Sequence, residues 1–586
     1  MRYFLRAIKN MIFFVIKQVF GTLISLSLII FLITLISVGL IQERTNEKLE
    51  ISKNTYVYLA FPDGIEEKTD INWKNMRFDI EMNFLSVIET LESIRKDTKV
   101  EGLILDLDQT FLAANHIEEI SEKLREIKRS GKKIYAFANY INKNNYYLGV
   151  LADEIYMSPS YSTSFSLGSY SLKVPYYKKL GDKLGVEAQV INIGDFKSLG
   201  ENYIKEGMSK EFRENYTRLL DNSLNNFITK ISQERKISKD LFETNLLNGE
   251  YLMLDAKSAK VLGLIDSLSF YDDFLEEKSI DNISSLQEYY IASKKNINVE
   301  NKIAVIIANG EIRMESDDLF NTVFISPDNI IPQIDLAMED ESIKGVVLRV
   351  NSPGGSALAS EIILDKLIKL NNKKPVYVSM SSVAASGGYY ISSNASKIFA
   401  EEQTITGSIG VVSLVFNIEN FYKNIGLNFE TIEKGRNLSL GNINKRLSAE
   451  DVELIRKSGE RTYQEFKNRV IQGRNIDADS LEEIAQGKVW TGLEAKKIGL
   501  VDEIGGVEVT INSLAKHLNL SNYEVINLES SKTKLDMLFE MKQYIFMDKN
   551  LRSLNENILE LKDKINFMEE INGKYIYMLP YEFELK

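Results

Sequence analysis

A serine flanked by small residues is the first candidate for chemistry in this chain. The stretch "VAASGGYY" (383–390) puts Ser386 between two alanines and two glycines, directly before a tyrosine pair. Small neighbours leave space around a hydroxyl, which suits a nucleophile. A serine nucleophile also needs a base, and the 586 residues include only two histidines, His116 and His517. The base therefore has to be sought among other residue types as well.

An internal repeat offers such a base. "VEGLILDLDQT" from Val100 matches "IKGVVLRVNSP" from Ile343, and the tyrosine pair at 146–147 falls on the pair at 389–390. Self-similarity over such a distance indicates a tandem duplication. We place the two copies near residues 55–275 and 300–520.

The two copies differ where chemistry is expected. The second copy has "NSPGGS" at 351–356, and it has Ser386 where the first copy has Lys143. The first copy has Lys197 where the second has Leu438. Each copy thus carries residues that the other has lost, which predicts one composite site built from both.

A lysine base and a glycine loop would complete a serine hydrolase site. Lysine can take the proton of a serine only when neutral, and burial lowers its pKa, so a Ser–Lys pair can replace Ser-His-Asp. Glycines in 351–356 would expose N–H groups to an oxyanion, with the N–H of Gly387 as second donor. Each feature also has a structural explanation: a tight turn at Ser386, a type II turn at 351–356 and a surface position for Lys197. Ser408 could hold the lysine amine or merely satisfy its own loop.

The elements that must position these residues have an α/β pattern. Ile303–Ala308, Gly345–Val350 and Pro375–Met380 are short apolar runs typical of buried strands, and Glu361–Leu370 has helical spacing. Strands that alternate with helices predict βαβ units on a largely parallel sheet.

Composition and charge exclude several other functions. The chain has no cysteine, which excludes disulfides, thiolate metal sites and cysteine nucleophiles. Because the chain has only two histidines and no HExxH motif, the sequence predicts no metal site. A net charge of −12 at pH 7 argues against nucleic acid as a partner.

The N-terminal part predicts a membrane anchor. Residues 19–41 carry no charge, and a run of this length can span a bilayer as one helix. Residues 1–18 include four basic side chains, which favours a cytoplasmic N-terminus and an extracytoplasmic remainder. At the other end, residues 521–586 are expected to form a helical extension, with an apolar heptad stripe from Leu551 to Met568. We expect the final stretch, 572–586, to pack near the site of its own chain or of a neighbour.

Several motifs together resemble one protease family. They are "GDFKSLGENYIKEGMS" (194–209), "RVNSPGGS" (349–356), "AASGGYYIS" (384–392), "TGSIGV" (406–411) and "VWTGLEAKKIGLVDEIGG" (489–506). The chain is similar in these motifs, in its membrane segment and in both repeats to the signal peptide peptidase A family in its long bacterial form, also called protease IV.

This resemblance implies a fold and a set of roles. Each repeat would have a ClpP/crotonase-like fold, and no cofactor would be needed. The implied catalytic residues are Ser386 as nucleophile, Lys197 as general base and Ser408 as the residue that positions the lysine. The implied oxyanion donors are Gly354 or Gly355 together with Gly387. Leu199 follows Lys-Ser where the family often has alanine, which leaves the base intact but changes subsite detail.

The resemblance also implies partners and a location. The family forms a tetramer on the outer face of the bacterial cytoplasmic membrane and degrades remnant signal peptides released by leader peptidase. Two alternatives of other classes are a catalytically silent ring scaffold and an acyl-CoA enzyme of the crotonase type. A scaffold would be expected to lack the nucleophile or the glycine loop, and both are present. An extracytoplasmic location argues against coenzyme A as substrate.

Overall fold

The computed structural model describes most of the chain between residue 50 and residue 579. The described residues are 50–67, 82–293, 299–314, 323–432, 434–435, 442–528 and 574–579. The predicted membrane segment at 19–41, Leu438 and the stripe at 551–568 lie outside them. Within the described ranges, no helix is both long enough and apolar enough to cross a membrane.

The first repeat contains a parallel sheet in the order β8-β5-β3-β2-β1-β9. Its strands are β1 (Thr55–Phe61), β2 (Val100–Thr110), β3 (Lys133–Ala138), β5 (Glu154–Met157), β8 (Ser267–Leu268) and β9 (Asn282–Ser285). A short separate pair consists of β4 (Tyr140–Ile141) and β6 (Ser164–Phe165). Helices cover the sheet, so its central strands are apolar on both faces.

The second repeat contains the corresponding sheet, with the path β19-β17-β15-β13-β10-β21. Its strands are β10 (Lys302–Asn309), β13 (Ile343–Ser352), β15 (Val376–Ala385), β16 (Lys397–Ala400), β17 (Ile405–Gly407), β19 (Val489–Thr491), β20 (Glu503–Ile504) and β21 (Glu524–Leu528). The pairs β10–β13 and β13–β15 are parallel, and β17–β19 is antiparallel. The three strands and the helix predicted from the sequence of this repeat are therefore confirmed.

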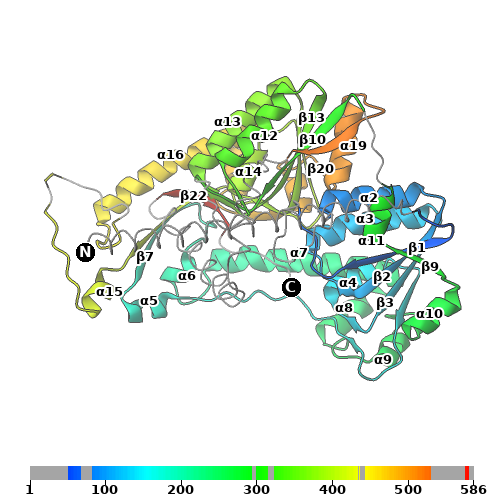
Figure 1. The fold of residues 1–586 in the computed structure, drawn as a ribbon. Helices are drawn as coiled ribbons and strands as arrows, with labels where there is room; N and C mark the ends of the chain where they lie inside the picture. The colour runs from blue at the N-terminus through cyan, green and yellow to red at the C-terminus, as the bar shows by residue number, and fades with distance from the viewer. Residues whose placement is uncertain are drawn as a thin grey trace, which may run out of the picture.

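Helices flank both sheets (Figure 1). The first repeat has α2 (Phe84–Lys96), α3 (Ala114–Arg129), α4 (Lys143–Gly149), α5 (Lys178–Leu184), α6 (Glu201–Ile204), α7 (Lys210–Arg235), α8 (Lys239–Leu247), α9 (Ala256–Val261), α10 (Tyr271–Lys278) and α11 (Leu286–Ser293). The second has α12 (Pro327–Glu339), α13 (Ala357–Lys373), α14 (Gly387–Ser392), α15 (Glu419–Asn424), α16 (Ala449–Arg474), α17 (Ala478–Ile484), α18 (Gly492–Lys497) and α19 (Val507–His517). Ser209 and Ser448 cap the two longest helices, α7 and α16, each of 26 residues. These long helices thus begin in the same way in both repeats.

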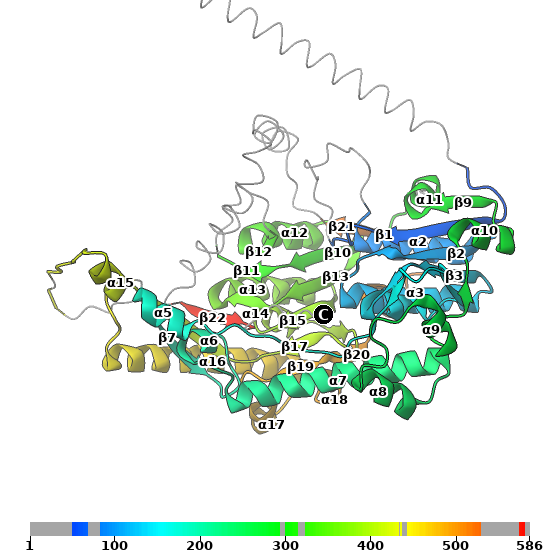
Figure 2. The ribbon, with the colours of Figure 1, turned by 90° about the horizontal axis from the view of Figure 1, so that it is seen from below.

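A third sheet joins the repeats and the C-terminal segment. Its order is β12-β11-β14-β22-β18-β7. The strands are β7 (Glu187–Ile193), β11 (Glu311–Ile312), β12 (Phe324–Ile325), β14 (Gly354–Ser356), β18 (Val411–Asn417) and β22 (Tyr575–Met578). Strand β7 belongs to the first repeat and pairs antiparallel with β18 of the second. Figure 2 shows β22, in red, beside α14.

The C-terminal segment differs from its predicted form where it is described. Residues 521–586 are predicted to be a helical extension, but the described residues at both ends of the segment contain strands, β21 and β22. Each strand completes a sheet: β21 pairs with β10, and β22 lies between β14 and β18. Sheet edges offer unpaired N–H and C=O groups, and these residues satisfy them.

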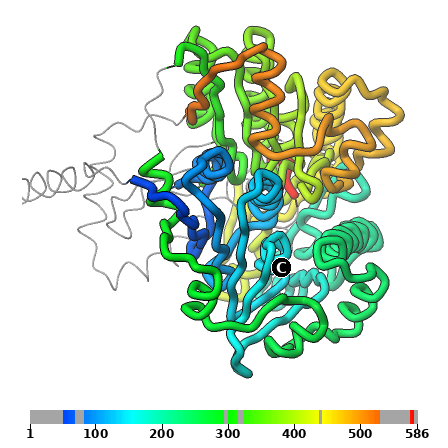
Figure 3. The backbone as a smooth tube through the Cα atoms, turned by 90° about the vertical axis from the view of Figure 1, so that its right-hand side faces the viewer, coloured from blue at the N-terminus to red at the C-terminus, as the bar shows by residue number. Residues whose placement is uncertain are grey.

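One apolar cluster spans the junction of the two repeats, and a second one lies mostly within the second repeat. The largest apolar cluster combines strands and helices of the first repeat with Val347, Tyr377 and Phe399 of the second. Figure 3 shows the blue and cyan chain of the first repeat packed against the green and orange chain of the second. A buried ion cluster crosses the same junction, where Arg349 Nη2 lies 2.8 Å from Glu67 Oε1 and 2.6 Å from Glu119 Oε1. The repeats therefore hold each other in one fixed arrangement.

Candidate active site

Ser386 lies at the turn between β15 and α14. Its backbone has φ +55° and ψ −112°, a conformation that is strained for a residue with a side chain. Although serine commonly caps a helix, the Ser386 side chain makes no capping hydrogen bond to α14. The backbone N–H of Ser386 donates to the carbonyl of Gly407 at 2.8 Å, which fixes the turn. The hydroxyl is thus turned away from its own helix and available to another group.

That group is Lys197 of the first repeat. Its Nζ lies 2.7 Å from Ser386 Oγ, although the two residues are 189 positions apart in the sequence. The antiparallel pairing of β7 with β18 brings the loop after β7 to this point, because Ile193 is in register with Val411. Lys197 and Ser386 are both fully buried. The structure therefore brings together the two residues that the repeats hold separately.

Ser408 completes the surroundings of the amine. Lys197 Nζ lies 3.0 Å from Ser408 Oγ and 3.0 Å from its carbonyl oxygen. Ser408 has φ +54°, and its N–H donates to the carbonyl of Lys488 at 2.7 Å. Three oxygen atoms therefore surround the lysine nitrogen, two from Ser408 and one from Ser386.

Burial sets the protonation of this amine. It holds the pKa of Lys197 well below its usual value, because a charged ammonium would lose its hydration without gaining a carboxylate partner. Within the described ranges, no carboxylate forms an ion pair with Lys197. A neutral amine has a lone pair that can accept a proton from a hydroxyl at 2.7 Å. The arrangement can therefore turn the Ser386 hydroxyl into a nucleophile.

The glycine loop adjoins the same point. Gly354 has φ +101° and Gly355 has φ +154°, values that side chains rarely allow. A Cβ at Gly354 would lie 2.7 Å from the N of Gly387, whereas a Cβ at Gly355 would meet Ile312 O of β11 at 2.0 Å. Of the two candidate donors, the one beside Gly387 and hence beside Ser386 is Gly354. The N–H of Gly354 donates to Ser352 Oγ at 3.2 Å, and a backbone N–H at such a place can instead bind a developing oxyanion.

Three further contacts of the lysine loop were missed from the sequence. Gly487, at φ +80°, touches the lysine backbone so closely that a Cβ there would lie 2.5 Å from Lys197 N. The carbonyl of Gln486 accepts the N–H of Phe196 at 2.8 Å, and Gly410 approaches the lysine side chain. Gly410 lies in the quoted motif "TGSIGV" (406–411), and Gly487 lies in "AQGK" (485–488), which nothing in the sequence links to a lysine almost 300 residues earlier.

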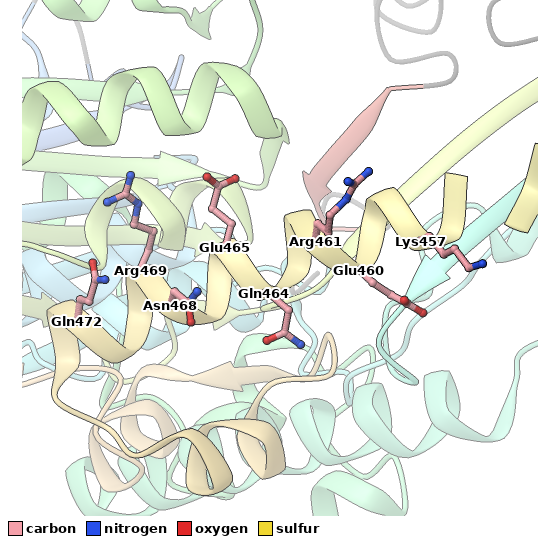
Figure 4. A pocket seen from close by; sticks show the side chains of 8 residues that line it. All are labelled: Lys457, Glu460, Arg461, Gln464, Glu465, Asn468, Arg469 and Gln472. Atoms are coloured by element: carbon pink, nitrogen blue, oxygen red, sulfur yellow. The ribbon is translucent and has the colours of Figure 1, made fainter. Parts of the chain in front are cut away.

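Other candidate groups lie elsewhere. His116 is buried with its Nε2 3.3 Å from Glu67 Oε1, and His517 ends α19 beside Tyr377, so neither histidine serves Ser386. No group of three acidic or histidine residues that could hold a metal occurs in the described part of the chain. A polar hollow runs along α16 between Lys457 and Gln472 (Figure 4). Its side chains carry charges of both signs on one helix face, as a solvated surface does, and include none of the residues above.

Comparison with known proteins gives two matched regions and several relatives. The profile of peptidase family S49 matches residues 126–283 and 368–521, one region for each repeat. Protease 4 of Salmonella typhi is 32% identical over 480 residues, which cover 78% of this chain and 76% of that protein. The chloroplastic serine protease SPPA of Arabidopsis thaliana is 31% identical over 472 residues, or 78% of this chain and 69% of that one. A putative signal peptide peptidase SppA of Enterococcus faecium is 31% identical over 278 residues, or 47% of this chain and 81% of that one.

Proposed function

Because this chain belongs to peptidase family S49 and is a serine peptidase, we propose that it cleaves peptide bonds with Ser386 as nucleophile and Lys197 as general base. The observation that carries this proposal is the buried lysine amine 2.7 Å from a serine hydroxyl, with no carboxylate beside it among the described residues. Such an amine has no evident structural task, because a charged ammonium that is buried without a carboxylate partner destabilises a fold. The burial of the Lys197 amine is explained if catalysis needs the amine in its neutral form.

The proposed reaction follows from the positions of these groups. Ser386 Oγ attacks the carbonyl carbon of the peptide while its proton passes to Lys197 Nζ. The resulting oxyanion accepts hydrogen bonds from the N–H groups of Gly354 and Gly387. Lys197 then gives the proton to the departing amine as the C–N bond breaks, which leaves an acyl-enzyme ester. A water molecule, deprotonated by the same lysine, releases the acid and restores Ser386.

Ser408 is proposed to orient the base. Two contacts of 3.0 Å to the amine leave it little freedom, and both are to uncharged oxygens. Uncharged partners hold the amine in place without favouring its protonated form as strongly as a carboxylate would. The strained turn at Ser386 adds to this fixed geometry, since it keeps the hydroxyl away from the helix end.

The proposed substrates are remnant signal peptides and other peptides of the cell envelope. The name of the Enterococcus faecium relative supports this substrate class. The uncharged segment at 19–41 supports an anchor in the bacterial cytoplasmic membrane, with the peptidase outside the cytoplasm. We also propose a ClpP/crotonase-like fold for each repeat and assembly into a homotetramer.

Covalent labelling tests the pair directly. The solubilised full chain should react with a fluorophosphonate at Ser386, and Lys197→Ala should lose this reaction while its thermal unfolding midpoint is retained. Ser386→Ala is the control for labelling elsewhere. If the folded wild-type chain takes no label, or if Lys197→Ala reacts as fast as the wild type, the Ser–Lys assignment is wrong. In the first case the silent scaffold becomes the better description.

A further inference from the structure

Strand β15 is irregular directly before the proposed nucleophile. Its register with β13 shifts at Asn351, where this one residue of β13 lies opposite three residues of β15, 381–383. These three residues form a bulge, and Ser386 follows its last residue by three positions. A bulge beside an active site changes the direction in which the following side chains point. Whatever holds the bulge 381–383 therefore also sets where Ser386 lies.

The second repeat holds this bulge with a single weak contact from Asn351. The N–H of Val383 donates to Asn351 Oδ1 at 3.3 Å. In the alignment of the two copies, Asn351 falls on Asp108 and Val383 falls on Tyr140. Asp108 accepts the N–H of Tyr140 at 2.8 Å and the N–H of Asn139 at 2.8 Å. The first repeat thus fixes the equivalent turn with a carboxylate, which is a stronger acceptor than the amide of Asn351.

A residue of the first repeat, Asn115, holds the bulge from the other side. Asn115 is buried in the first turn of α3. Its Nδ2 donates to Ser381 Oγ at 2.6 Å, and the hydroxyl of Ser382 donates to its Oδ1. The equivalent position in the second repeat is Leu358, which is exposed. The second repeat therefore has no amide with which to return this contact.

The hydrogen bonds at Asn115 have a fixed direction. Burial raises the pKa of Glu67, but the Arg349 guanidinium outweighs burial and holds this pKa well below its usual range. The ionised carboxylate can only accept, so the Ser381 hydroxyl donates to Glu67 Oε1 at 2.6 Å. The Ser381 oxygen is left to accept from Asn115, and the Asn115 oxygen is left to accept from Ser382. One orientation of the Asn115 amide satisfies the whole chain of hydrogen bonds.

We propose that Asn115 is a positioning residue for Ser386, because it fixes the bulge 381–383 and through it the backbone of the nucleophile. This inference rests on the proposed function, since it takes Ser386 as the nucleophile. After the bulge, β15 runs along β17, where the carbonyl of Gly407 accepts the Ser386 N–H at 2.8 Å. A displaced bulge would disturb this pairing and the 2.7 Å contact between Ser386 Oγ and Lys197 Nζ. The first repeat would then contribute two side chains to the reaction, Lys197 as base and Asn115 as support.

A positioning role has a kinetic signature of its own. A misplaced nucleophile slows the chemical step, and a displacement of about 1 Å can cost about 10² in rate. A substrate cannot touch Asn115, which is buried at the junction of the repeats, so KM should change little. The Lys197 amine has its contacts with Ser386 and Ser408, so the pH midpoint of the activity should also stay the same.

Kinetics and fluorophosphonate labelling of the solubilised full chain test this role. In Asn115→Ala, kcat and the labelling rate of Ser386 should both fall at least about tenfold, with KM within about twofold of wild type. Lys123→Met is the matched control on α3, because Lys123 pairs across the same junction with Glu508 of α19 rather than with β15. It should lower the unfolding midpoint and leave kcat unchanged, since it weakens the junction without reaching the bulge.

Two serine variants approach the same contact from β15. Ser382→Ala removes the hydroxyl that Asn115 accepts, and kcat should fall several-fold. The double variant Asn115→Ala/Ser382→Ala should lose no more than Asn115→Ala alone, because both changes remove the same hydrogen bond. Ser379→Ala is the matched control, since Ser379 lies on β15 before the bulge and accepts from Arg349 Nη1 at 3.0 Å. Its kcat should equal that of wild type.

The outcomes separate this inference from the peptidase assignment. Wild-type kcat and labelling in Asn115→Ala would overturn the positioning role and leave the Ser–Lys pair intact. A shifted pH midpoint would also overturn it, because Asn115 would then act on the base. If Asn115→Ala does not fold, Ser382→Ala decides, and an unchanged kcat there refutes the inference. A folded wild-type chain that takes no label shows instead that the Ser–Lys assignment is wrong, and the role of Asn115 falls with it.

Discussion

Replacing Lys197 by methionine should separate catalysis from stability. Methionine has a similar length and no charge, so it can fill the buried channel of the lysine without an unpaired polar group. We expect kcat/KM of Lys197→Met to fall by roughly 10²–10⁴-fold, the usual contribution of general-base catalysis. The unfolding midpoint should be equal or higher, because the variant no longer buries an amine at 1% exposure.

The magnitude follows from the protonation of the amine. A lysine with the ordinary pKa of about 10.4 is neutral in roughly one molecule of 2,500 at pH 7, which corresponds to about 4–5 kcal/mol. Each unit by which burial lowers the pKa of Lys197 makes the neutral form about tenfold more abundant. Because the base acts when neutral, wild-type kcat/KM should rise with pH and reach its plateau below pH 10.4. Activity is lost as pH falls through the pKa of Lys197 in the folded chain.

The lowered pKa of Lys197 also predicts how the free energy of unfolding changes with pH. Between the lowered pKa of folded Lys197 and the ordinary value near 10.4, the unfolded chain binds a proton that the folded chain does not. The free energy of unfolding should therefore rise with pH in this window, by up to about 1.4 kcal/mol per pH unit from this group. Lys197→Met should lack this part of the slope, so its advantage over wild type is largest at low pH.

The assay combines two measurements on the same proteins. Peptide hydrolysis and urea unfolding are followed between pH 6 and 10 for wild type, Lys197→Met and the control Lys210→Met, which replaces an exposed lysine at the start of α7. The control should match wild type in both. Hydrolysis by Lys197→Met within tenfold of wild type would refute the base assignment. A variant that is inactive but also strongly destabilised at every pH would refute the argument that the buried amine is a burden to the fold.

Three other substitutions probe the neighbouring contacts. Ser408→Ala removes one oxygen partner of the Lys197 amine. We expect kcat to fall by roughly 5–30-fold, equivalent to about 1–2 kcal/mol, with little change in KM. An unchanged kcat would contradict a positioning role for Ser408. Gly354→Ala would put a Cβ 1.9 Å from Tyr577 O of β22 and 2.7 Å from the N of Gly387, at a φ of +101°. Both hydrolysis and fluorophosphonate labelling should drop by about 10² or more, and normal labelling would remove Gly354 from the proposed oxyanion site. Arg349→Met leaves Glu67 and Glu119 buried without the guanidinium that pairs with both. The free energy of unfolding measured with urea should fall by about 3–5 kcal/mol. A decrease below about 1 kcal/mol would mean that the cluster does not join the repeats.

The part of the site that could be predicted from the sequence is the part with a local or repeated signal. Strands such as Gly345–Val350 are continuous apolar runs, and the structure extends this one to Ile343–Ser352. The expectation that Lys197 and Ser386 meet comes from comparing the two copies, because a duplicated fold keeps equivalent positions at equivalent places. Residues 572–586 are expected near a site, but the strand form of β22 within them was not predicted.

Contacts set by packing alone had no such signal. Gly487 touches Lys197 because the loop after α17 crosses the loop after β7, and a single glycine does not reveal which backbone approaches it. Arg349 and Glu67 form an ion pair across 282 positions, and neither residue type is unusual in its own stretch of sequence. Such pairs depend on how the repeats dock, which neither periodicity nor motif spacing encodes.

The first repeat shows why the nucleophile could not simply be kept in both copies. Lys143 is the counterpart of Ser386, but it is the first residue of α4, and Asn142 caps that helix with a full capping box. Helix α14 of the second repeat begins one residue later, so Ser386, the equivalent of Lys143, is itself the cap residue, strained and without a capping bond. The first repeat thus has the unstrained form of the same turn, and its lysine lies over the ring of Tyr170, 3.4 Å from the centroid. Burial lowers the pKa of Lys143 to about 8. A helix start that is properly capped has no free hydroxyl, so only the copy that gives up its cap can supply a nucleophile.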